Sequence, residues 1–282
     1  MIKEKLKKMI FLRYLIHFPK DTITLVKYKR KIFKLEKLSL QKGKDLSIFK
    51  DRYKGKRCFV IGLGPSLTVG DLDLLKNEIC FSSNRIYQLF DKTSWRPTFF
   101  CSGDPTFSEK IGEMLVSITE NVKYVILNLA HVKNYDVRVW NRGNVYFYKT
   151  IVGTGFDAIN KERGKFRERL DFIKEIDSIG TITYEIIEMA LYMGFSEIIL
   201  LGVDHFYGGG KHNYAGGLKP LTVDDKSQMG SIISTQRWTD GYKYIKKLSE
   251  KKGIQIKNAT RGGNLEVFER VDLESIVKGG VS

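Results

Sequence analysis

The five residues Gly62–Ser66 (Gly-Leu-Gly-Pro-Ser) have the composition of a loop that holds a phosphate group. The apolar run before them, Arg57–Ile61, reads as a short buried strand, and the residues from Asp71 onward read as the first turns of a helix. Glycine lets the backbone approach a phosphate closely, and the unpaired N–H groups at a helix start favour negative charge. The sequence therefore predicts a phosphate or nucleotide site at this loop, with packing as the alternative reason for its glycines.

Polar side chains also follow three later apolar runs, where we expect strands to end. Asn84 follows the second run, Asp104 the third, and Asp204 and His205 the sixth. Asn84 is suited to bind a ribose or a base, but asparagine and an aspartate before proline are also common turn residues. Asp204 and His205 are two titratable groups at one strand end, which makes them candidate catalytic residues.

These residues are positioned by apolar runs that alternate with helical stretches, which is the pattern of a parallel α/β sheet. The runs lie at 57–61, 79–83, 98–102, 122–129, 144–148, 197–202 and 254–257, and the helical pattern is clearest at 166–176 and 181–193. We therefore predict an α/β fold with a Rossmann-like, mostly parallel sheet and helices on both faces. In such sheets the ligand crevice lies at the carboxyl ends of the strands.

The basic charge of the chain is concentrated before this alternating region. Residues 1–57 hold 19 Lys/Arg and 5 Asp/Glu, a net charge of +14 out of +16 for all 282 residues. We predict a basic amphipathic helical arm at 1–55, ahead of a nucleotide-binding catalytic domain at 56–282. A basic amphipathic segment suits an anionic membrane surface, so we expect residues 1–50 to bind one. A helical arm packed on its own domain or on a protein partner is the alternative.

The sequence contains no apolar run of the roughly 20 residues that a membrane-spanning helix needs, and no signal-peptide cleavage site. We therefore expect a cytoplasmic protein that is peripheral on the inner face of the cell membrane. No DNA- or RNA-binding motif accompanies the basic charge, so we expect no nucleic-acid partner. The sequence leaves open whether the chain forms a homo-oligomer.

No metal site is predicted. The three cysteines, Cys58, Cys80 and Cys101, lie far apart in or beside apolar runs, and they read as buried, reduced thiols. Asp71 and Asp73 have the Asp-x-Asp form of metal-dependent glycosyltransferases. Their place in the first helical turn after a glycine loop favours helix capping instead.

Several motifs taken in order resemble a known family. They are Gly-x-Gly-Pro-Ser-Leu after the first strand, Ser-Asn-Arg after the second, and the helix 181–193 running into Gly194-Phe-Ser-Glu-Ile-Ile-Leu-Leu-Gly-Val-Asp204. Residues 56–270 resemble the bacterial sialyltransferases that use CMP-activated sugars. They equally resemble the motility accessory factor glycosyltransferases and the 6-hydroxymethylpterin diphosphokinase MptE-like proteins. The resemblance implies a single Rossmann-like nucleotide domain with a lid over the site, expected here at about 206–236.

The resemblance also implies which residues bind the donor nucleotide. Matched position by position, they are Gly62, Gly64, Pro65, Ser66, Asn84, Asp104, Thr181, Thr183, Tyr207 and Tyr214. Two positions depart from the family pattern, since Leu63 and Asp104 stand where the family has asparagine. For Tyr207 and Tyr214, packing of lid aromatics is the alternative.

A larger departure concerns the catalytic base. The family's histidine lies just before a late helix, where this chain reads Ser-Thr-Gln-Arg-Trp-Thr-Asp at 234–240. His212, or His205 with Asp204, is then the candidate to take the proton of the acceptor hydroxyl. Lys211 and Arg237 are candidates to meet the leaving phosphate, with surface charge as their alternative role.

The sequence favours a glycosyltransferase that moves a sugar from a nucleotide donor, with a CMP-activated acidic sugar favoured, to a cell-surface polysaccharide or lipid-linked acceptor. No tightly bound cofactor is expected. An ATP-dependent diphosphokinase is the alternative, with Asp104 and Asp204 as carboxylates for Mg²⁺. A nucleotide-binding assembly factor without catalysis is the third possibility.

Overall fold

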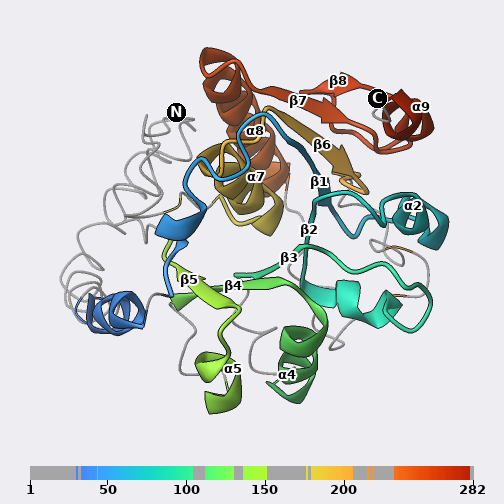
Figure 1. Cartoon of the computed structure of the whole chain (residues 1–282). Helices are drawn as coiled ribbons and strands as arrows, with labels where there is room; N and C mark the ends of the chain where they lie inside the picture. Colours follow the sequence, from blue (N-terminus) through green and yellow to red (C-terminus); the bar gives the residue numbers. More distant parts are fainter. Residues whose placement is uncertain are drawn as a thin grey trace.

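The computed structural model describes residues 30, 33–42, 44–103, 112–129, 136–150, 176, 179–205, 215, 218 and 232–279. At its centre is an eight-stranded sheet with the order β5-β4-β3-β2-β1-β6-β7-β8, in which every neighbouring pair is parallel (Figure 1). The strands are β1 (Arg57–Ile61), β2 (Cys80–Ser83), β3 (Phe99–Ser102), β4 (Tyr124–Asn128), β5 (Val145–Tyr148), β6 (Glu197–Leu201), β7 (Gln255–Asn258) and β8 (Glu269–Arg270). This sheet confirms the predicted α/β fold.

The strands form at consecutive apolar residues, because helices cover both faces of a parallel sheet and leave little of it in water. In β2 and β3 all four residues are buried, and in β1 and β6 the last four are buried. Each of the predicted runs coincides with a strand to within two residues at either end. β8 was not predicted, since a strand of two charged residues leaves no apolar run.

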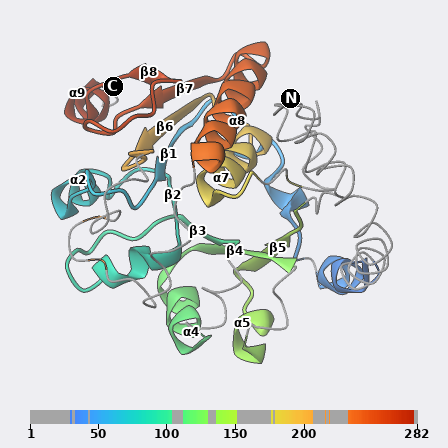
Figure 2. The same cartoon turned by 180° about the vertical axis from the view of Figure 1, so that it is seen from behind.

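Helices lie on both faces of the sheet, as predicted. One face carries η2 (Asn84–Leu89), α2 (Val69–Leu74), α4 (Gly112–Asn121), α5 (Val137–Asn141) and α9 (Leu273–Gly279), and the other carries α7 (Ile182–Tyr192) and α8 (Ile232–Lys251). Figures 1 and 2 show the two sets from opposite sides, with β5 at one end of the sheet and β8 with α9 at the other. The predicted helix at 181–193 is confirmed with Thr181 and Met193 as its caps. The one predicted at 166–176 lies outside the described residues apart from Ile176.

The chain changes direction across the sheet between β1 and β6. From β1 it adds β2 to β5 on one side in order, and it then returns to place β6 on the other side of β1. In an open α/β sheet such a switch point leaves a crevice at the carboxyl ends of the two strands. We therefore expect the crevice at the residues that follow Ile61 and Leu201.

The segment before β1 packs into the core of the sheet. Phe49, in the 3-10 helix η1 (Leu46–Phe49), is fully buried, and its ring meets those of Phe99 and Tyr124 edge to face at centroid distances of 5.6 and 5.0 Å. The backbone N–H of Phe147 donates to the carbonyl of Lys44 at 2.9 Å. Residues 44–49 are thus held by the sheet, whereas the helix at 33–41 leaves Phe33 67% exposed.

Ion pairs join neighbouring elements near the amino ends of the strands. Arg57 donates through Nε to Glu78 at 3.1 Å and through Nη1 to the carbonyl of Ile276 at 2.9 Å, and Lys257 pairs with Glu197 at 2.7 Å. All four charged side chains are about four-fifths shielded from water. These contacts therefore stabilise the amino-terminal edge of the sheet, which is opposite the edge where we expect the crevice.

The three cysteines are buried and free, as predicted. Among the described helices, none combines the length and the apolar character needed to cross a membrane.

Candidate functional site

The glycine loop, Gly62–Ser66 after β1, packs against the residues that follow β6. The N–H groups of Gly62 and Gly64 donate to the carbonyls of Leu201 and Gly202, each at 2.8 Å. A Cβ built on Gly62 would lie 2.4 Å from the carbonyl oxygen of Gly202, and one on Gly64 would lie 1.8 Å from Oδ2 of Asp204. Both positions therefore require glycine for packing between the two strand ends, whatever ligand the loop holds.

Asp204 is the residue around which three loops meet. Its side chain accepts a hydrogen bond from Oγ of Ser66 at 2.8 Å, and its carbonyl accepts one from the N–H of Asn264 at 2.7 Å. A Cβ on Gly263 would lie 2.6 Å from that same carbonyl oxygen. Burial raises the pKa of the Asp204 carboxyl, while hydrogen bonds from the hydroxyl and the backbone N–H of Ser66 oppose the rise. The carboxylate thereby ties the glycine loop to β6.

His205 follows in a left-handed conformation with φ of 52° and is 6% exposed. Its Nε2 lies 2.8 Å from Oγ1 of Thr239 in α8, and that hydroxyl donates its proton to the carbonyl of Thr235 at 2.9 Å. Because the hydroxyl has one proton, it accepts from Nε2–H, which leaves Nδ1 as the basic nitrogen of the ring. Burial lowers the pKa of His205, so the imidazole is neutral at pH 7.

Thr181 and Thr183 join α7 to α8. Thr181 occupies the N-cap position of α7, but its side chain makes no capping hydrogen bond. Both threonine side chains instead hydrogen-bond to the hydroxyl of Tyr242, whose pKa burial raises to about 12 while these bonds oppose the rise. The ring of Tyr242 also meets that of His205 edge to face at 5.6 Å. The two threonines thus contact the element that holds His205.

Asn84 lies at the carboxyl end of β2, beside β1. Its backbone is left-handed, with φ of 50°, a conformation that asparagine tolerates better than most residues. Its Oδ1 is buried and accepts no hydrogen bond from the described residues. An acceptor oxygen in this state is suited to a ligand that donates a hydrogen bond. The predicted residues Gly62, Gly64, Pro65, Ser66 and Asn84 therefore lie at the ends of neighbouring strands.

The remaining predicted residues lie outside the described part of the chain. They are Asp104, Tyr207, Lys211, His212 and Tyr214. Within the expected lid, Ala215 is described, and its N–H donates to the carbonyl of Leu63 at 2.7 Å. Arg237, on α8, approaches Gly180 ahead of α7, because a Cβ on that glycine would lie 2.8 Å from Nη2 of Arg237.

The loop after β7 contributes residues that the sequence did not single out. Oγ1 of Thr260 accepts from the N–H of Val203 at 3.0 Å, and Arg261 donates through Nη1 to Asp71 at 2.9 Å and to the carbonyl of Ser66 at 3.3 Å. Arg270 in turn donates through Nη1 to the carbonyl of Thr260 at 2.8 Å. The signal was the polar run Asn-Ala-Thr-Arg-Gly-Gly after the last predicted strand, one more strand end at the same edge.

The expectation that Asp71 caps a helix is confirmed. Asp71 and Thr68 form a capping box at the start of α2, with hydrogen bonds of 2.9 and 3.2 Å between side chain and backbone. Asp73 instead pairs with Thr93 at 2.7 Å and Lys76 at 3.1 Å. In the described residues no group of three or more His, Cys, Asp or Glu side chains is arranged to hold a metal ion.

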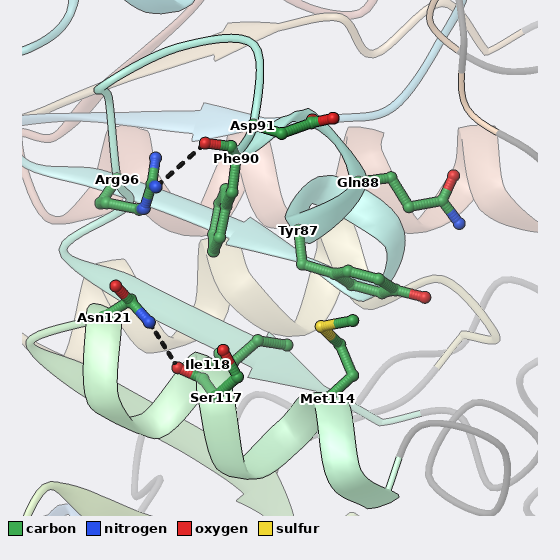
Figure 3. Close-up of a pocket in the computed structure, with 9 residues that line it drawn as sticks. All are labelled: Tyr87, Gln88, Phe90, Asp91, Arg96, Met114, Ser117, Ile118 and Asn121. Atoms are coloured by element: carbon green, nitrogen blue, oxygen red, sulfur yellow. Dashed lines mark hydrogen bonds between the residues drawn. The ribbon is translucent and has the colours of Figure 1, made fainter.

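A separate pocket of about 440 Å³ lies between η2 and α4 (Figure 3). Tyr87, Phe90, Met114 and Ile118 supply its apolar lining, and Gln88, Asp91, Arg96, Ser117 and Asn121 supply its polar lining. The guanidinium of Arg96 lies over the ring of Phe90 at 4.3 Å from the centroid and donates to the carbonyl of that residue at 3.0 Å. The pocket includes none of the predicted site residues.

Comparison with known proteins identifies one matching family. The sequence model of the family described as 6-hydroxymethylpterin diphosphokinase MptE-like matches residues 34–210. This family was one of the three that the motifs resemble, so that part of the prediction is confirmed. No curated protein matches the sequence.

Three solved structures illustrate what the chain is similar to. The MAf glycosyltransferase of Magnetospirillum magneticum AMB-1 is 16% identical with a TM-score of 0.49, over 87% of this chain and 39% of that protein. The sialyltransferase CstII of Campylobacter jejuni, in complex with the substrate analogue CMP-3FNeuAc, is 16% identical with a TM-score of 0.46, over 77% of this chain and 86% of that one. The α-2,3-sialyltransferase Cst-I of Campylobacter jejuni is 16% identical with a TM-score of 0.44, over 72% and 75%. This chain thus spans less than half of the MAf glycosyltransferase.

Proposed function

The chain belongs to the 6-hydroxymethylpterin diphosphokinase MptE-like family, and we propose that it is a glycosyltransferase that moves a sugar from a nucleotide donor to a hydroxyl group of a glycan. The favoured donor carries a CMP-activated, acidic sugar. The acceptor is a cell-surface polysaccharide or a lipid-linked glycan.

One observation carries the proposal. His205, whose imidazole is neutral, directly follows Asp204, the residue that binds the glycine loop. Asp204 accepts from Ser66 of the loop at 2.8 Å, and His205 is the next residue. A base and a candidate phosphate loop are thus parts of one structural unit at the switch point. Transfer from a nucleotide to a hydroxyl group needs both, because the acceptor must lose a proton while the phosphate leaves.

In the proposed reaction the acceptor oxygen forms a bond to the anomeric carbon of the sugar, and the bond from that carbon to the phosphate oxygen breaks. The electron pair of the broken bond leaves with the nucleotide phosphate, and His205 takes the acceptor proton on Nδ1. Lys211 and Arg237 would meet the growing charge on the phosphate, because the N–H groups of Gly62 and Gly64 already donate to the carbonyls of Leu201 and Gly202. His212 remains the alternative base, and Tyr207 and Tyr214 remain candidate phosphate ligands.

The pocket between η2 and α4 lies on the face of the sheet opposite α8, so we propose it for a part of the glycan acceptor remote from the sugar that reacts. Its lining balances one carboxylate, Asp91, against one guanidinium, Arg96, and combines aromatic rings with amide and hydroxyl groups. A neutral sugar ring suits such a surface, since its C–H face packs on aromatic groups and its hydroxyls bind the polar ones. Tyr87 lies in the same short helix that Asn84 opens, at the crevice end of β2. The variant Tyr87→Ala should raise the KM for the acceptor and leave nucleotide affinity unchanged.

We also propose that the basic arm binds an anionic membrane surface. On the helix at 33–41, Phe33 is 67% and Leu40 is 49% exposed, and lysines 34 and 37 are exposed beside them. Removing residues 1–50 would be a poor test, because Phe49 is fully buried. The double variant Phe33→Ser with Leu40→Ser should instead lose sedimentation with vesicles rich in phosphatidylserine. Val137→Ser removes an apolar side chain that is 68% exposed outside the arm, and it serves as the control.

A diphosphokinase that uses ATP and Mg²⁺ is the second candidate function, and the description of the matching family favours it. Mg²⁺ would need carboxylate oxygens beside the phosphates. Asp204 already accepts hydrogen bonds from the hydroxyl and the backbone N–H of Ser66, so it fits a magnesium site poorly. Asp104 lies outside the described residues. We therefore derive no step through the metal ion.

A thermal-shift panel of CMP, UDP, GDP and ATP, each with and without Mg²⁺, separates the two functions. We expect CMP to raise the melting temperature without Mg²⁺, and Asn84→Ala to reduce that shift. A shift given only by ATP with Mg²⁺ would favour the diphosphokinase. If no nucleotide raises the melting temperature, both functions are wrong and a non-catalytic assembly role gains support.

A further inference from the structure

Two side-chain oxygens at the carboxyl ends of β2 and β3 are buried and have no hydrogen-bond partner in the part of the chain that the structure describes. They are Oδ1 of Asn84 and Oγ of Ser102, and Ser102 as a whole is 1% exposed. Two neighbouring polar side chains, Ser82 and Asn128, do make hydrogen bonds. Oγ of Ser82 donates to the carbonyl of Ile61 at 3.2 Å, and Nδ2 of Asn128 donates to Thr150 at 3.2 Å. Because native proteins leave few buried polar groups without a partner, the two orphaned oxygens need an explanation.

The two residues lie side by side. The register of β2 and β3 pairs Ser83 with Cys101, Asn84 is the next residue beyond β2, and Ser102 is the last residue of β3. Neighbouring strands lie about 4.8 Å apart, so the two side chains start within reach of one small group. Alternation along β3 places Ser102 on the same face as Phe100, which packs in the cluster under α2 and α4.

The chemistry of the two oxygens defines the group that they can bind. A serine hydroxyl both donates and accepts, and the carboxamide oxygen of asparagine only accepts. An acceptor oxygen repels a phosphate, so the pair selects a neutral group with hydroxyl protons. Two hydroxyls on adjacent carbons can donate one proton to Asn84 while the second exchanges a hydrogen bond with Ser102.

We propose that Asn84 and Ser102 form a subsite for a vicinal diol, and that Ser102 strengthens the preference for a nucleotide whose ribose carries both the 2′- and the 3′-hydroxyl. The proposal rests on the proposed function, because it requires a nucleotide in the crevice. The ribose is the favoured source of the diol. In Rossmann folds the ribose lies at the end of the second strand, about 20 residues after the glycine loop, and Asn84 has that position.

The test combines a protein variant that lacks the Ser102 hydroxyl with a ligand that lacks the 2′- and 3′-hydroxyls of the ribose. Affinities of CMP and of 2′,3′-dideoxy-CMP are measured by calorimetry for the parent and for Ser102→Ala. In the parent, CMP should bind about tenfold more tightly than the dideoxy analogue, which is the loss expected for a hydrogen bond or two. In Ser102→Ala this ratio should fall to about two- or threefold, while the dideoxy analogue binds both proteins alike.

A second readout separates ligand binding from a structural role. A hydroxyl without a partner destabilises the empty protein, so Ser102→Ala without ligand should melt about 2–4 °C higher than the parent. The matched control is Ser249→Ala, a serine that is 1% exposed in α8 and whose Oγ donates to the carbonyl of Lys246 at 2.8 Å. That variant should melt lower than the parent and keep the full CMP preference.

The outcomes distinguish this proposal from the proposed function. If CMP does not bind the parent, both are wrong. If CMP binds but Ser102→Ala keeps the full preference for the ribose hydroxyls, the ribose is not the diol. In that case, the affinity of Ser102→Ala for a CMP-sugar, relative to its affinity for CMP, decides whether the diol belongs to the transferred sugar. A selective loss of CMP-sugar affinity in Ser102→Ala would place the diol of the transferred sugar in the subsite, and no loss would overturn the proposal.

Discussion

Replacing Gly64 with alanine should destabilise the protein strongly, because the space for a side chain is already occupied. The new Cβ would lie 1.8 Å from Oδ2 of Asp204 and 2.8 Å from the carbonyl oxygen of Gly202. Neither group can retreat easily. Asp204 is bound by Ser66 through its side chain and by Asn264 through its carbonyl, and the carbonyl of Gly202 accepts from Gly64 itself.

The expected magnitude follows from these contacts. Overpacking costs about 1–3 kcal/mol, and displacing the carboxylate weakens a hydrogen bond to a charged group worth about 1.5–3 kcal/mol. We therefore expect a loss of about 2–4 kcal/mol, which corresponds to a fall in melting temperature of roughly 5–12 °C in a chain of this size.

The matched control is Gly70→Ala in the first turn of α2. A Cβ at Gly70 would lie 3.7 Å from Oγ1 of Thr68, an ordinary contact. Alanine is the better helix former by about 0.5–1 kcal/mol, so this variant should be slightly more stable than the parent. Urea unfolding of both variants at pH 7 measures the difference.

A double variant tests the cause of the loss. Asp204→Ala removes the carboxylate that the new Cβ would meet and leaves the contact with the carbonyl of Gly202, so Gly64→Ala should cost less in an Asp204→Ala background than in the parent. If Gly64→Ala is as stable as Gly70→Ala, or if its cost is unchanged in the Asp204→Ala background, the packing between the two strand ends is not as described.

Three further predictions concern the charges of the site and of the opposite edge. His205→Asn keeps a residue type that tolerates the left-handed backbone and removes the base, so kcat should fall about 10²- to 10⁴-fold while the melting temperature changes little; an unchanged kcat would assign the base elsewhere. Asp204→Asn should be more stable than the parent at pH 7, because burial raises the pKa of the carboxyl and ionisation then disfavours the folded state. That advantage should be complete above the raised pKa and vanish below about pH 3.8, the unfolded value, and an advantage that grows toward low pH in unfolding titrations would contradict it. Arg57→Met breaks the contacts with Glu78 and the carbonyl of Ile276, so calorimetry should show a loss of about 1–2 kcal/mol with nucleotide affinity intact; weakened nucleotide binding would mean that the two edges of the sheet are coupled.

The parallel sheet could be predicted because its strands are buried on both faces and therefore appear as short apolar runs. β1 was predicted without error, and the ends of the others differ by two residues at most. β8 could not be predicted, since its two residues, Glu269 and Arg270, are charged and form no apolar run.

Parts of the candidate site depend on contacts between distant segments, and these left no local signal. The pairing of Asp71 with Arg261 joins residues 190 positions apart. The sequence assigned Gly64 to a phosphate, whereas the structure shows that Asp204 also requires glycine there. Thr181 and Thr183 were predicted at the site, but their link to Tyr242 in α8 depended on how two helices pack.

Hydrogen–deuterium exchange with and without CMP tests the central claim most directly, because it locates the nucleotide on the chain. We expect slower exchange in the glycine loop 62–67, at 84–86 after β2 and at 202–205 after β6, with no change at the amino-terminal edge around Arg57 and Glu197. Protection confined to other segments, or no protection at a saturating CMP concentration, would contradict a nucleotide site at the switch point between β1 and β6.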